Sequence, residues 1–151
     1  MEHKTDFNVG LIGVGLNTYW AQFEGLHERL LGYQQTIRER MEAYSVNVID
    51  GGLLDSPQNV RHAADEMTNK NIEILFVYIS TYALSSLILP LAQQCKVPVI
   101  FLFLQPVAAI DYKYFNSLPG RKEMTGEWLA HCQACSAPEF AAVLNRTDVM
   151  Y

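Results

Sequence analysis

The sequence predicts an α/β fold, a three-layer doubly wound parallel sheet, in a single domain spanning residues 1–151. Two observations lead to this prediction. Four short apolar segments alternate with segments that have helical periodicity, and each apolar segment is continuous rather than alternating with polar residues. Continuous apolar strands are typical of parallel sheets that helices cover on both faces. A chain of this length is also sufficient for one well-buried domain.

The first apolar segment, residues 7–14, predicts a buried strand that enters a tight turn at Gly13 and Gly15. Apolar side chains then recur every three or four residues from Phe23 to Tyr44, which predicts a long helix with one buried stripe. Residues 46–49 predict the second strand, and we expect it to end at residues 50–52, Asp-Gly-Gly.

Ser56 followed by Pro57 is typical of a helix start, because the serine can cap the helix and proline presets the first helical φ. We expect this helix to bury Val60, Ala63, Ala64 and Met67. Residues 72–79 predict the third strand, from their β-branched and aromatic composition. Ser80 or Thr81 is expected to cap the following helix, which Pro90 should kink.

Residues 97–104 predict the fourth strand, and residues 105–120 a long loop of the kind that is often functional. A last helix is predicted over about 125–144. Residues 148–151 resemble the beginning of another strand, so we expect the domain to be truncated from a longer multidomain protein.

Composition excludes several classes of function. The chain has 11 Lys and Arg against 16 Asp and Glu, without a basic cluster, so no nucleic-acid partner is expected. The apolar segments are too short to cross a bilayer, so no membrane partner is expected. The polar first ten residues predict a cytoplasmic protein. Three cysteines do not make a disulfide framework.

The turn after the first strand admits a nucleotide-binding interpretation. Gly13 and Gly15 follow a strand and precede a helix, and Asp50 could hold a ribose, although Thr18 replaces the third glycine of the dinucleotide fingerprint. The alternative is an ordinary tight turn. Ligands of such folds bind at the carboxyl ends of the strands. The residues expected there are uncharged and suit a sugar: Asn17, Thr18, Tyr19, Trp20, Ser80, Thr81, Tyr82 and Gln105.

Residues 126–146, GEWLAHCQACSAPEFAAVLNR, concentrate reactive side chains. Cys132 and Cys135 could form a redox pair or half of a zinc site, but no second ligand pair has suitable spacing, which favours two structural thiols. His131 and Gln133 could contact sugar hydroxyls or serve only structural hydrogen bonds. Glu139 is expected to cap a helix. The remaining histidines, His3, His27 and His62, are expected at the surface.

Four segments, GLIGVGLNTYW, ILFVYISTYA, VPVIFLFLQP and HCQACSAPEFAAVLNR, occur in the order in which the L-fucose and L-arabinose isomerase superfamily has them. The chain therefore resembles the N-terminal domain of that superfamily. The resemblance implies a flavodoxin/Rossmann-like domain of an enzyme that interconverts an aldose and a ketose. It also implies that Mn²⁺, or another divalent metal, is held by later domains, with no catalytic residue, metal ligand or cofactor in this chain.

By the same resemblance, this domain supplies one wall of a sugar pocket that is shared between the subunits of a homo-oligomer. The substrate-binding residues it implies are Tyr19, Trp20, Gln105, His131 and Gln133, and the chain alone is expected to be inactive. Two alternatives stay open: a nucleotide or small-ligand binding module of the Rossmann type, and a non-catalytic assembly domain.

Overall fold

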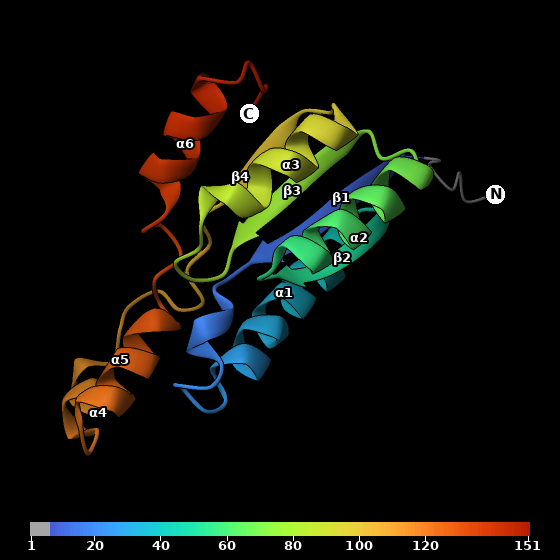
Figure 1. The fold of residues 1–151 in the computed structure, drawn as a ribbon. Helices are drawn as coiled ribbons and strands as arrows, with labels where there is room; N and C mark the ends of the chain where they lie inside the picture. Colours follow the sequence, from blue (N-terminus) through green and yellow to red (C-terminus); the bar gives the residue numbers. More distant parts are fainter. Residues whose placement is uncertain (1–6) are drawn as a thin grey trace.

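A computed structural model describes residues 7–151, so the expectation for His3 lies outside the described residues. It contains one sheet of four parallel strands, in the order β2-β1-β3-β4 (Figure 1). The strands are β1 (Asn8–Val14), β2 (Asn47–Leu54), β3 (Ile74–Ile79) and β4 (Val99–Leu102). The predicted doubly wound α/β architecture is therefore confirmed.

Helices lie on both faces of the sheet. The helix α1 (Leu26–Glu42) covers one face, and α2 (Pro57–Asn69) and α3 (Ser85–Cys95) cover the other (Figure 1). The larger core lies between the sheet and α2 and α3, where the four residues predicted to point inward from α2 are all buried. A smaller core joins β1 and β2 to α1.

The second strand is longer than predicted, because it continues through the two glycines to Leu54. Its pairing with β1 shifts register between Leu11 and Gly13, and Gly52 takes a φ of +76° that favours glycine at such an irregularity. A Cβ on Gly51 would lie 2.9 Å from the end of Met67, so this glycine allows α2 to approach the sheet. The glycines bend the strand rather than end it.

The start of α2 is as predicted. Ser56 accepts a hydrogen bond from the Asn59 backbone N–H, and the Asn59 side chain accepts one from the Ser56 N–H, which completes a capping box. Pro90 lies inside α3, as predicted. However, α3 begins only at Ser85, so neither Ser80 nor Thr81 caps it, and both are fully buried.

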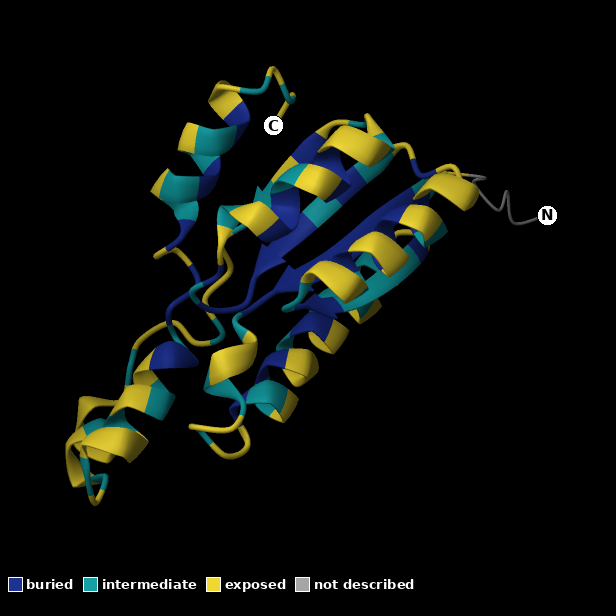
Figure 2. Ribbon diagram, in the orientation of Figure 1, coloured by how far each residue is buried: buried dark blue, intermediate teal, exposed yellow. Residues whose placement is uncertain are grey.

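The last third of the chain differs most from the prediction. The expected loop contains α4 (Tyr112–Ser117), and the single predicted helix is two helices, α5 (Arg121–Leu129) and α6 (Ala137–Asn145). Figure 2 shows α4 and α5 as a largely exposed lobe beyond the sheet, whereas α6 returns to α3. Residues 148–151 do not form a strand. No helix within residues 7–151 is long and apolar enough to cross a membrane.

Candidate functional site

The carboxyl ends of all four strands lie at one edge of the sheet, because the strands are parallel. The chain leaves β1 over one face and β2 over the other, so the crevice of this fold lies between the ends of β1 and β3. Three segments meet at this edge: the turn after β1, residues 80–85 after β3, and residues 129–139, which run from the end of α5 into the first turn of α6. The last of these crosses the crevice.

The turn after β1 is a short 3₁₀ helix, η1 (Asn17–Tyr19), followed by Trp20. The Trp20 indole N–H donates to Asp55 Oδ2 at 2.6 Å, and its ring lies 4.8 Å from that of His27. A Cβ on Gly15 would lie 2.8 Å from the indole, so the glycine makes room for it. Trp20 therefore packs against residues of its own domain. His27, which was predicted at the surface, is half-buried.

The residues of the nucleotide interpretation are engaged in internal contacts. Asp50 lies inside β2, not at its end, and its Oδ1 accepts hydrogen bonds from Gln34 Nε2 at 2.7 Å and from the Gly52 N–H at 2.9 Å. The Gln34 amide occupies the space that a Cβ on Gly13 would need. The glycines at this turn are therefore explained by packing of side chains from the same domain.

The sequence predicted one helix where the structure has α5 and α6, because the chain leaves the helical conformation in a break between them. Pro138 in the first turn of α6 cannot donate to a preceding carbonyl, so a continuous helix would lose a hydrogen bond there. Instead, the Thr81 hydroxyl donates to the Leu129 carbonyl at 2.9 Å. Gln133 Nε2 donates to the Ala130 carbonyl at 2.7 Å. Both bonds go to carbonyls at the end of α5, where the Leu129 carbonyl also accepts from the Cys132 N–H at 3.2 Å.

Gln133 also holds this segment to the sheet. Its side chain is fully buried and donates to the Ser80 carbonyl at 3.1 Å, directly after β3. Burial raises the pKa of the neighbouring Tyr78 hydroxyl, and interaction with Gln133 partly offsets that rise. Gln133, which was predicted to contact a sugar, is in this structure a buried side chain whose hydrogen bonds link β3 to the end of α5.

Two residues at the end of the break hold the segment that leads into α3. The Ser136 hydroxyl accepts from the Ala83 N–H at 2.9 Å, and Glu139 Oε1 accepts from the Ser85 N–H at 2.8 Å. That backbone bond lowers the pKa of Glu139. Glu139 therefore has the predicted capping role, but at the start of α3 as well as in the first turn of its own helix.

His131 belongs to an ionic cluster that links the break to α1. Its side chain is only 6% exposed, and Nε2 lies 3.1 Å from Glu127 Oε1 and 3.4 Å from an Arg29 nitrogen. Arg29 binds both oxygens of Glu127, at 2.6 and 3.2 Å, and its Nε donates to the Tyr33 hydroxyl. The arginine hydrogen bond lowers the pKa of Glu127. His131 Nδ1 is buried and has no hydrogen-bond partner within residues 7–151.

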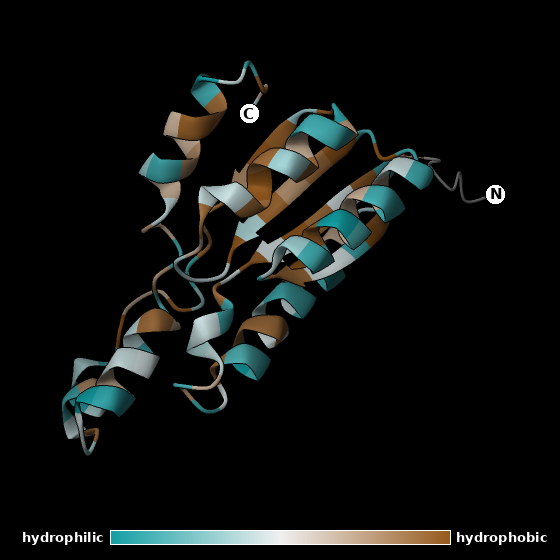
Figure 3. Ribbon diagram, viewed as in Figure 1, coloured by the Kyte–Doolittle hydropathy of each residue, from teal (hydrophilic) through white to brown (hydrophobic). Residues whose placement is uncertain are grey.

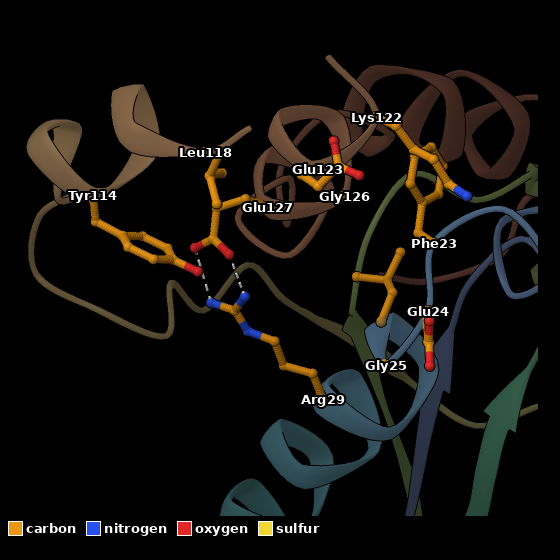
Figure 4. Close-up of a pocket in the computed structure, with 11 residues that line it drawn as sticks. Phe23, Glu24, Gly25, Arg29, Tyr114, Leu118, Lys122, Glu123, Gly126 and Glu127 are labelled. Carbon is orange, nitrogen blue, oxygen red and sulfur yellow. Dashed lines mark hydrogen bonds and ion pairs between the residues drawn. The ribbon is translucent and has the colours of Figure 1, made fainter. Parts of the chain in front are cut away.

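This ionic cluster forms one side of a cavity of about 400 Å³ between α1 and the α4–α5 lobe (Figure 4). Figure 4 shows the Arg29 guanidinium and the Glu127 carboxylate facing each other, with Tyr114 beside them. The cavity is lined by two aromatic rings, two cations, three carboxylates and four other residues: Phe23, Tyr114, Arg29, Lys122, Glu24, Glu123, Glu127, Gly25, Leu26, Leu118 and Gly126.

None of the five predicted site residues lines this cavity, but two adjoin it. Tyr19 meets Phe23 edge to face at 6.0 Å, and His131 contacts Glu127. Gln105 is exposed in the irregular segment after β4. Sequence reasoning missed Arg29 and Glu127, because they are separated by 98 positions and belong to different helices. No local pattern marks such a pair.

The two cysteines of the break differ in exposure. Cys132 is 7% exposed, and burial raises the pKa of its thiol to about 12. Cys135 is exposed, and its thiol donates to the Cys132 carbonyl at 2.9 Å. No group of three His, Cys, Asp or Glu side chains within residues 7–151 is placed to hold a metal ion. Cys132 therefore packs in the interior, while Cys135 lies at the surface.

Comparison with known proteins gives no assignment: no protein-family model matches the chain, and no curated protein sequence matches it either.

Proposed function

We propose that this chain is the sugar-facing N-terminal domain of an aldose–ketose isomerase of the L-arabinose/L-fucose type. The observation that carries the proposal is the cavity beyond the carboxyl edge of the sheet. Its volume of about 400 Å³ is within the range of small-molecule sites. Aromatic rings suit the C–H faces of a sugar, while carboxylates and an arginine suit its hydroxyl groups.

The charges of the lining favour a neutral polyol over an anion. Two cations, Arg29 and Lys122, stand against three carboxylates, and Arg29 is already neutralised by Glu127. A phosphate group entering this cavity would meet a net negative charge. A sugar hydroxyl can instead donate to a carboxylate and accept from the guanidinium.

The proposal gives His131 an indirect role. Its Nε2 contacts the Glu127 oxygen, so it holds the carboxylate that faces the cavity rather than touching the sugar itself. Tyr19 supports Phe23 in the same way. Gln133 fixes the segment from which His131 projects.

The outer rim of the cavity is exposed at Glu24, Lys122 and Glu123. We propose that a second subunit completes the pocket there, in a cytoplasmic homo-oligomer. The Mn²⁺ of the reaction would belong to other parts of the enzyme, since the side chains of residues 7–151 do not converge on a metal site. The proposal assigns to this chain sugar contacts only.

The nucleotide alternative has less support, because Gly13, Gly15 and Asp50 are occupied by Gln34 and Trp20. Titrating NAD into the protein separates the two interpretations. The sugar interpretation predicts no saturable NAD binding, and saturable binding would favour the Rossmann-type module.

The proposal is tested by NMR titration of the chain with L-arabinose and L-fucose. We expect binding with a dissociation constant on the order of millimolar, as befits a small ligand on one wall of a pocket. The signals that shift should come from the cavity lining, and Glu127→Gln should weaken binding. Glu73→Gln, at an exposed position directly before β3, is the matched control and should leave binding unchanged. Equal shifts in both variants, or none in the parent chain, would contradict the proposal.

A further inference from the structure

The break between α5 and α6 contains two cysteines that one turn brings together. Cys132 directly precedes residues 133–136, which are in turn conformation, and Cys135 lies among them. The Cys135 thiol donates to the Cys132 carbonyl at 2.9 Å, so its sulfur lies against the other cysteine. Residues three positions apart in a turn have Cα atoms within about 7 Å, which overlaps the separations of about 4.4–6.8 Å that disulfides span. The turn therefore brings the two cysteines within reach of a disulfide.

The two thiols differ in access. Cys135 is exposed, so a dissolved molecule can reach its sulfur. Cys132 is only 7% exposed, and its pKa is raised by burial and, to a smaller extent, by interaction with the Cys135 thiol. The thiolate is the reactive form of cysteine, so a reaction with a dissolved molecule begins at Cys135. Cys132 is then reached from within the turn, by the sulfur of Cys135, rather than from solvent.

The turn lies over the carboxyl edge of the sheet. Burial, and then the neighbouring Cys135 and Cys132 thiols, raises the pKa of Tyr19, which follows β1. The Glu139 carboxylate chiefly raises the pKa of Tyr82, which follows β3, and Cys135 adds a smaller contribution. Figure 3 shows hydrophilic and hydrophobic residues mixed along this segment, as expected for a connection that is partly core and partly surface. The thiols therefore lie between the ends of two neighbouring strands.

We propose that Cys132 and Cys135 form a reversible disulfide, with a low-molecular-weight disulfide as the oxidant. The Cys135 thiolate attacks one sulfur of the oxidant, whose S–S bond breaks and releases the first small thiol. The Cys132 sulfur then attacks Cys135 Sγ, displaces the second small thiol and closes the bridge. The two protein thiols lose two electrons and two protons, which the oxidant takes up as it becomes two small thiols. This site does not depend on the proposed function.

The bridge would act on the segment that holds β3 to α5. Gln133 lies between the two cysteines, inside the ring that the bridge closes, and its amide donates to the Ser80 and Ala130 carbonyls. A cross-link restricts the unfolded chain, so the oxidised form should unfold at a higher temperature than the reduced form. The ring is short, so a rise in Tm of only a few degrees is expected. An unchanged Tm would overturn this effect of the bridge.

The experiment treats the folded chain with oxidised glutathione at about pH 8 and follows its intact mass. We expect a transient adduct with one glutathione, followed by a product that has lost two hydrogens. Peptide mapping without reduction should place the bridge between Cys132 and Cys135. Cys132→Ala should instead accumulate the glutathione adduct on Cys135. Cys95→Ala, which removes the partly buried third cysteine at the end of α3, is the matched control and should form the bridge as the parent chain does.

The second step is intramolecular, so the adduct should disappear about tenfold or more faster from the parent chain than from Cys132→Ala. An adduct that persists equally in the two proteins would overturn the proposal. So would a bridge that mapping assigns to Cys95, or one that joins the Cys135 residues of two chains. The mapping of the parent chain decides the question even if Cys132→Ala fails to fold.

Discussion

Replacing Gln133 by leucine should destabilise the whole domain, although the side chain lies in an irregular segment. Gln133 is fully buried, and its amide donates both to the Ser80 carbonyl after β3 and to the Ala130 carbonyl at the end of α5. Leucine has a similar size but no donor. The substitution therefore leaves two buried carbonyls without their partner, at residues that are themselves fully buried.

The magnitude follows from the cost of a buried polar group that loses its hydrogen bond, about 1–3 kcal/mol each. The loss is partly offset, because the Gln133 Oε1 atom is buried without a partner and its removal relieves a penalty of the same kind. A net loss of about 1–3 kcal/mol in the free energy of unfolding is expected. For a domain of this size, that corresponds to a fall in Tm of about 2–12 °C.

Thermal unfolding followed by circular dichroism, together with urea titration, measures this change. Gln105→Leu is the matched control, because Gln105 is exposed after β4, and its effect should stay within about 0.5 kcal/mol. If the two variants unfolded at the same temperature, the hydrogen bonds of Gln133 would not stabilise the contact between β3 and α5.

Three further predictions concern other contacts. Arg29→Met should destabilise by about 1 kcal/mol at neutral pH, since the pair is partly exposed and screened. Because Arg29 lowers the pKa of Glu127 in the folded state, the difference in unfolding free energy between the variant and the parent chain should shrink as the pH falls below 4.5, the ordinary pKa of glutamate. Unfolding measured across that pH range tests this. Ser56→Ala should cost about 1 kcal/mol through loss of the α2 cap, and an unchanged urea midpoint would refute the capping box. At about pH 8, a thiol reagent should modify the exposed Cys135 and spare the buried Cys132, whose pKa is raised; mass mapping that found both modified would contradict this.

Much of the fold could be predicted because its signals are local. The Ser56–Pro57 start of α2 and the apolar strand that ends at Ile79 are properties of short segments, and both are present in the structure. The errors also have local causes. The glycines of β2 indicated a turn, but pairing with β1 and the close approach of α2 keep them in the strand.

The site was less predictable because it depends on contacts across the whole chain. The sequence drew attention to His131 and Gln133, but the residues that they contact could not be inferred from spacing. Arg29 and Glu127 are charged residues of two separate helices, and only the tertiary fold brings them together. Charge pairs between distant helices leave no pattern in a single sequence.

The segment between α5 and α6, which lies over the carboxyl edge of the sheet, affects the order in which the domain folds. β1, β2 and β3 are complete by Ile79, whereas the groups that close the carboxyl edge, at Gln133, Ser136 and Glu139, come more than fifty positions later. During synthesis the N-terminal strands can pair while the start of α3 still lacks its caps. The carboxyl edge of the sheet therefore closes late in folding, through contacts between distant residues. In nascent chains halted before this segment, the open edge should be cleaved by proteases that the complete chain resists.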